Sequence, residues 1–162
     1  PAETVEQVDD MVRWMKYPPY GERALFMGAN TDYRNVDAEQ YCREANEATM
    51  LVLKIESALG VENAEQLMAN EWVDGIVFGP GDLAASMGFH GGWQHPEVLA
   101  AMESVIELPL AHGISVEPAE FPVDGGEYAR QRERGIQIFG PTRTTEYQLL
   151  KGAAEREIAV YR

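Results

Sequence analysis

Leu51-Val52-Leu53-Lys54-Ile55-Glu56 and Val73-Asp74-Gly75-Ile76-Val77-Phe78-Gly79-Pro80-Gly81-Asp82-Leu83 are the two stretches that decide the fold. Each is an apolar, β-branched run typical of a strand, and each is followed by a carboxylate, Glu56 or Asp82. Residues 62–70, between them, are predicted to form a helix. Parallel strands joined by right-handed crossovers end at one edge of a sheet, so we expect the two carboxylates to lie side by side on one rim.

Two chemistries suit adjacent carboxylates on a rim. They can ligate a divalent cation, or they can act as an acid/base pair. A structural alternative is that each acid merely caps the helix that follows it. The matched positions of Glu56 and Asp82 at the ends of two neighbouring strands favour the cation site.

The rest of the chain continues the same alternation. Further helices are predicted over residues 4–16, 38–49, 96–108, 125–134 and 144–160, and further strands over 113–118 and 136–140, while 23–28 is a short strand or an irregular segment. Strands alternating with helices predict a parallel sheet covered by helices, in one domain spanning residues 1–162. Four βα units are about half of an eight-stranded barrel of ~250 residues. The glycine-rich phosphate turn of a doubly wound sheet is missing after the first strand.

Composition excludes several classes of function. The net charge of -14 disfavours nucleic acid and anionic membrane surfaces as partners. A single cysteine, Cys42, leaves no internal disulfide framework and fits a reducing compartment. The sequence has neither a membrane-helix pattern nor a signal-peptide pattern, and it does not begin with methionine. We therefore expect a cytoplasmic protein whose start has been processed, cut or left out.

Four motifs, in order along the chain, resemble those of one enzyme family. They are Tyr17-Pro18-Pro19-x-Gly21-x-Arg23, Lys54-Ile55-Glu56, Gly79-Pro80-Gly81-Asp82-Leu83-x-x-Ser86-Met87-Gly88 and His95-Pro96-Glu97-Val98. Together they resemble the HpcH/HpaI family of metal-dependent, class II pyruvate-type aldolases. The resemblance implies a (βα)8 TIM barrel, of which this chain covers roughly the C-terminal two-thirds. The four predicted strands would then be the fifth to the eighth.

The resemblance also implies a reaction and a site. Glu56 and Asp82 match the two protein ligands of a divalent cation, Mg²⁺, Mn²⁺ or Co²⁺. The implied reaction is the retro-aldol cleavage of a 4-hydroxy-2-oxo acid to pyruvate and an aldehyde, through an enolate that the metal stabilises. Gly81 and Asp82 match positions whose backbone amides hold the substrate carboxylate, and Thr31 matches a hydroxyl residue near it. A related citryl- or malyl-CoA lyase would share the fold, but the chain lacks a basic patch for the CoA phosphates.

Two departures from the family pattern bear on function. Lys54 stands where better-known members carry glutamine. It either faces the site, where it neutralises the carboxylates or grips an anionic substrate, or forms a structural pair with an acid. The family's catalytic histidine, its aspartate partner and its arginine belong to N-terminal strands that this sequence lacks, so no catalytic residue can be named. His90, His95 and His112 do not replace them, since each has a simpler explanation as a loop or helix-end residue.

We expect the chain to form only part of a barrel. Four βα units cannot close a barrel, so the outer strands would present open edges. We expect the segment to associate with another copy or with a missing N-terminal half, and aldolase activity to need that half for its base. The main rival is a truncated half-barrel that binds metal or oxo-acid without turnover.

Overall fold

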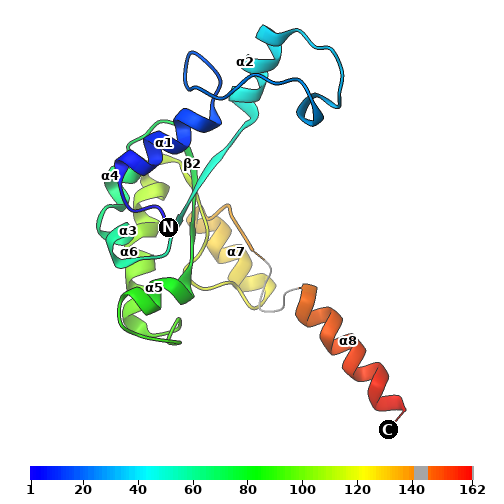
Figure 1. Ribbon diagram of the computed structural model, residues 1–162. Coiled ribbons are helices and arrows are strands. Elements are labelled where there is room, and N and C mark those ends of the chain that lie inside the picture. Colours follow the sequence, from blue (N-terminus) through cyan, green and yellow to red (C-terminus); the bar gives the residue numbers. More distant parts are fainter. Residues whose placement is uncertain (141–145, 162) are drawn as a thin grey trace.

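The computed structural model describes residues 1–140 and 146–161, and there helices alternate with parallel strands (Figure 1). The elements, in chain order, are α1 (Val5–Met15), the 3-10 helix η1 (Ala29–Thr31), α2 (Ala38–Ala48), β1 (Leu51–Ile55), α3 (Ala58–Glu62), α4 (Ala64–Met68), β2 (Val73–Phe78), α5 (Pro80–Ser86), α6 (Pro96–His112), β3 (Ser115–Val116), α7 (Gly125–Arg134) and α8 (Glu146–Val160).

The described strands form one parallel sheet in the order β1-β2-β3. In the register of β1 and β2, Ile55 lies opposite Phe78, so the two strands end level with each other. The continuation of β3 is held to β2 through the amide of Glu117, which donates to the carbonyl of Ile76 at 3.2 Å. The three strand ends therefore meet at one edge of the sheet.

The structure corrects four predicted elements. The strand expected over 113–118 is only the two-residue β3 (Ser115–Val116). The helix expected over 62–70 is two short helices, α3 and α4, separated by Asn63. α6 runs to His112, past the predicted end at 108. The strand expected over 136–140 is not formed, because the amides of Gln137 and Ile138 both donate to the one carbonyl of Val116 instead of continuing a ladder. The predicted helix start at residues 144 and 145 lies outside the described residues.

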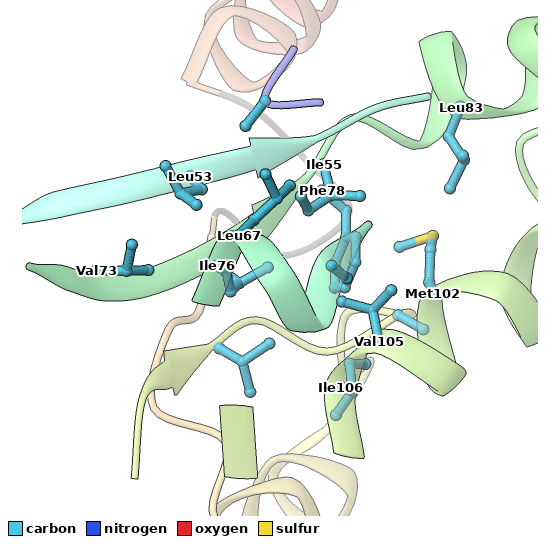
Figure 2. Packing of buried hydrophobic residues seen from close by; sticks show 14 of the residues in the cluster. Leu53, Ile55, Leu67, Val73, Ile76, Phe78, Leu83, Met102, Val105 and Ile106 are labelled. Atoms are coloured by element: carbon cyan, nitrogen blue, oxygen red, sulfur yellow. The ribbon is translucent and has the colours of Figure 1, made fainter. Parts of the chain in front are cut away.

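Helices cover one face of the sheet. In β1, Leu53 and Ile55 are buried, whereas the alternate residues Val52 and Lys54 are exposed. The buried side chains pack against β2, α4, α5 and α6, and Figure 2 labels Leu53, Ile55, Leu67, Val73, Ile76, Phe78, Leu83, Met102, Val105 and Ile106 among them. Such a half-buried strand fixes the register, because a slip of one residue would bury Lys54.

A buried lysine joins α1 to the end of α2. Lys16 directly follows α1, and its ammonium donates to the carbonyls of Asn46 and Thr49 at 2.6 and 2.7 Å, where α2 leaves its last carbonyls without partners. The ammonium also lies 4.4 Å from the centre of the Trp72 ring. Burial lowers the pKa of Lys16. The Lys16 ammonium thus satisfies carbonyls at the C-terminal end of α2.

The Tyr-Pro-Pro-x-Gly-x-Arg motif is used structurally. A Cβ atom on Gly21 would lie 2.7 Å from the carbonyl oxygen of Arg13, so only glycine fits against the end of α1. Arg23 reaches the carbonyl of Met15 at 3.4 Å and lies over the Tyr17 ring at 4.8 Å. These contacts hold the turn after α1 closed.

Asn46 should be among the most sensitive positions for stability. Its buried amide accepts from the backbone N–H of Tyr17 at 2.7 Å and donates to the Tyr17 carbonyl at 3.1 Å. Asn46→Ala leaves the backbone N–H and the carbonyl of Tyr17 without these hydrogen-bond partners. We therefore expect it to lower the free energy of unfolding by about 2–4 kcal/mol. The control is Gln40→Ala, which removes an exposed contact to Glu44 on the same helix and should change stability by less than ~0.5 kcal/mol. Urea unfolding that gives equal midpoints for the two variants would contradict this role.

α8 differs from the other helices in its exposure. Leu149, Leu150 and Tyr147 are 60%, 70% and 77% exposed, and the helix lies apart from the body of the molecule (Figure 1). Among the helices of the described residues, none combines the length and the apolar character that crossing a membrane requires.

Candidate metal centre

Glu56 lies directly after β1, at the rim, and forms an ion pair there. Its side chain is 14% exposed, and its Oε2 lies 2.6 Å from the ammonium of Lys54. The Lys54 ammonium lowers the pKa of the Glu56 carboxyl. Oε2 is buried and has no hydrogen bond of regular geometry, so the ion pair with Lys54 is its main compensation.

Gly79 makes room for this carboxylate. Its amide donates to the carbonyl of Ile55 at 2.9 Å, which brings the chain leaving β2 against the chain leaving β1. A Cβ atom on Gly79 would lie 2.6 Å from the Cβ of Glu56 and 3.0 Å from the Cε of Lys54. The first glycine of Gly-Pro-Gly-Asp is therefore required by the close approach of Glu56.

Asp82 lies on the neighbouring strand end, in the first turn of α5. The helix begins at Pro80, with Gly79 as its N-cap residue, and Asp82 is exposed. At the other strand end the helix cap is Ser57, whose hydroxyl accepts from the amide of Gly60 at 3.1 Å. Neither Glu56 nor Asp82 is an N-cap residue, so the alternative that the two acids merely cap the following helices is wrong.

Lys54 connects the two acids electrostatically. It projects from the exposed face of β1, and its charge interacts first with Glu56 and then, more weakly, with Asp82 and Glu117. These carboxylates raise the pKa of the Lys54 ammonium, Glu56 most of all. The two interpretations of Lys54 thus coincide, because the side chain faces the carboxylates and also pairs with one of them.

Glu117 is a third rim carboxylate that the sequence analysis did not single out. It directly follows β3, is only 8% exposed, and accepts a short hydrogen bond from the backbone N–H of Phe78 through Oε1. Burial raises its pKa. It lines a cavity of about 200 Å³, with walls that include Trp93 and Met102. The signal was in the sequence, since Ile114-Ser115-Val116-Glu117 is again an apolar run closed by an acid.

The raised pKa of Glu117 gives a pH prediction. A carboxyl whose pKa is higher in the folded than in the unfolded chain favours folding while it is protonated, below the unfolded value of about 4.5. That contribution is lost as the pH rises through the folded value. Glu117→Gln keeps an acceptor for the Phe78 amide without the charge. We expect thermal melts to show that the variant gains stability relative to the wild type between pH 4 and pH 8; a constant difference across this range would contradict the assignment.

A larger cavity, of about 540 Å³, lies elsewhere, between the Tyr17–Tyr20 turn and α2. Its lining includes Arg23, Leu25 and Cys42 but none of the rim carboxylates. Size alone would select this cavity, but the carboxylates that follow the strands are at the rim, where Glu56 pairs with Lys54, and we place the candidate site there.

Comparison with known proteins decides the family. A family model described as HpcH/HpaI aldolase/citrate lyase matches residues 2–136. The chain belongs to this family. The resemblance carried by the four motifs is thereby confirmed.

Curated relatives of this HpcH/HpaI chain are aldolases. It is 37% identical over 112 residues to a 5-keto-4-deoxy-D-glucarate aldolase from Shigella sonnei and 38% identical over 112 residues to a hydroxypyruvate/pyruvate aldolase from Delftia acidovorans. Each match covers 69% of this chain but only 43% and 42% of the respective relative. The matched part of the chain therefore spans less than half of the length of these relatives.

Solved structures of the family share the fold. An HpcH/HpaI aldolase from Desulfitobacterium hafniense superimposes with a TM-score of 0.82 at 26% identity, over 99% of this chain and 61% of that one. A family member from Burkholderia cenocepacia gives 0.80 at 28% identity, over 100% and 63%. These aldolase structures are of the TIM-barrel type. The three-stranded sheet described here is an α/β part of such a fold and does not by itself demonstrate a half-barrel.

The other two residues expected at the site, Gly81 and Thr31, lie in different parts of the structure. Gly81 is exposed at the start of α5, next to Asp82, and a Cβ atom there would meet nothing within 4 Å. Thr31 is buried in η1, and its hydroxyl donates to the carbonyl of Gly28 at 3.1 Å. η1 packs on α2 through Asn30 and Tyr41, so the structure does not bring Thr31 to the rim.

Proposed function

We propose that the protein to which this chain belongs is a divalent-metal-dependent carbon–carbon lyase. It cleaves a 4-hydroxy-2-oxo acid to pyruvate and an aldehyde, with Glu56 and Asp82 as the protein ligands of the cation. The observation that carries the proposal is the pair of acids at neighbouring strand ends, neither of them an N-cap residue, with the ammonium of Lys54 2.6 Å from Glu56. Membership of an aldolase/lyase family supports the reaction class.

The donor set fits a hard divalent cation. Both groups are carboxylates, and Glu56 carries a buried oxygen whose main compensation is a positive charge. Within residues 1–140 and 146–161 there is no cluster of three or more acidic, histidine or cysteine side chains that could hold a metal. Two protein ligands leave coordination positions for water and substrate oxygens, as an open catalytic site needs. When bound, the cation would supply Lewis-acid stabilisation of negative charge on the oxo-acid.

The chain's own residues then divide the remaining tasks. Gly79 leaves room for the Glu56 side chain beside the end of β2. The backbone amides of Gly81 and Asp82 are proposed to bind the substrate carboxylate, on the strength of the family resemblance. Lys54 is proposed to contact an anionic group of the substrate, because it projects from the same rim. The catalytic base is assigned to no residue of this chain.

The test uses the full-length enzyme. Pyruvate release from a panel of 4-hydroxy-2-oxo acids is followed after chelator treatment and again after addition of Mg²⁺, Mn²⁺ or Co²⁺. We expect activity to disappear with the chelator and to return with the metal. Undiminished activity after verified metal removal would contradict metal dependence, and cleavage of citryl- or malyl-CoA without activity on oxo-acids would contradict the substrate class.

A further inference from the structure

Glu56, one proposed metal ligand, forms an ion pair with the ammonium of Lys54. The ammonium of Lys54 lies 2.6 Å from Oε2, the buried oxygen for which no regular hydrogen bond is found. The distance is comparable to that of a divalent cation from a carboxylate oxygen, about 2.0–2.6 Å. An ammonium and a divalent cation repel each other, so both cannot occupy the same oxygen at this range.

Lys54 is held near the rim even when it leaves Glu56. Two further carboxylates, Asp82 and Glu117, attract its charge. Its side chain is 53% exposed, so no packing prevents it from swinging away from Glu56. The pair is therefore a contact that a competing cation can open without disturbing the core.

We propose that Lys54 competes with the divalent cation for Glu56 and so sets the affinity of the site below that of the two carboxylates alone. This inference rests on the proposed metal site. Cation binding requires Lys54 to release Oε2, and the energy of the ion pair is subtracted from the energy of binding. A neutral side chain at position 54 leaves Glu56 to the cation without that cost.

The experiment is a calorimetric titration of Mn²⁺ into the metal-free, full-length protein at fixed pH and ionic strength. Lys54→Gln and Lys54→Met replace the competing ammonium with an uncharged polar and an uncharged apolar side chain of similar length. Lys54→Arg retains the positive charge. The matched control is Lys151→Gln, which removes the same charge from α8, where Lys151 lies 3.8 Å from Glu155. Far-UV circular dichroism verifies that each variant is folded.

We expect Lys54→Gln and Lys54→Met to bind Mn²⁺ roughly three- to tenfold more tightly than the wild type, in keeping with the energy of a partly exposed ion pair. Lys54→Arg and Lys151→Gln should bind close to the wild-type affinity. Equal or weaker binding by the Gln and Met variants, with clear binding by the wild type, would overturn the competition but leave the metal site standing. Absence of binding in every protein would instead overturn the metal site itself.

Discussion

Glu56→Gln and Asp82→Asn should each lower kcat/KM for oxo-acid cleavage in the full-length enzyme by at least about 10²–10³-fold. Each variant removes one of the two charged ligands of the proposed cation, and with it the electrostatic stabilisation of the developing negative charge. The fold should survive. Asp82 is exposed in the first turn of α5, so Asp82→Asn should change stability by less than ~0.5 kcal/mol.

Asp32→Asn is the control for this pair. It removes an exposed carboxylate that pairs with Arg34 at 2.8 Å, outside the site. Coupled assays of pyruvate release at saturating Mg²⁺ should show wild-type kinetics for this control. Retention of more than about a tenth of wild-type activity by Asp82→Asn would mean that Asp82 is not a ligand on which catalysis depends.

Gly79→Ala should damage both the fold and the site. The added methyl group would stand 2.6 Å from the Cβ of Glu56, and Glu56 cannot retreat because Ile55 before it is fully buried. We expect a loss of roughly 2–3 kcal/mol in the free energy of unfolding, as for other overpacked positions. We also expect loss of cation binding, since the Glu56 side chain must move.

Gly81→Ala is the matched comparison, two residues along the chain. Its methyl group meets nothing within 4 Å, and alanine favours a helix over glycine by up to about 1 kcal/mol. Chemical unfolding should show Gly81→Ala to be as stable as the wild type or slightly more stable, with Mn²⁺ binding retained. Similar behaviour of the two alanine variants would contradict the steric account of Gly79.

The sequence predicted the two strands that precede the acids better than the extent of the sheet. The alternating burial of Leu53, Lys54 and Ile55 is a local feature, and it predicted β1 correctly. The strand around β3 was predicted over 113–118, and an acid closes its short apolar run as in the other two strands, but Glu117 was not singled out. The run at 136–140 is as apolar as a strand, but a strand also needs partners for its backbone groups, which periodicity does not report.

Long-range contacts explain what else was missed. Lys16 looks like an ordinary charged residue at the end of a helix, yet it is buried because the carbonyls at the end of α2, thirty and more residues away, receive its ammonium. Thr31 was matched to the site through the family resemblance, whereas the described chain places η1 on α2. The expectation that the chain associates with another copy or a further segment stays a prediction, with the exposed apolar residues of α8 in its favour.

The central claim is that Glu56 and Asp82 together hold one divalent cation. Its most direct test is the stoichiometry of Mn²⁺ bound by the metal-free, full-length protein, measured by titration calorimetry for the wild type, Glu56→Gln and Asp82→Asn. The account predicts about one ion per chain in the wild type and at least a hundredfold weaker binding in each variant. Binding of one ion with unchanged affinity in either variant would contradict it.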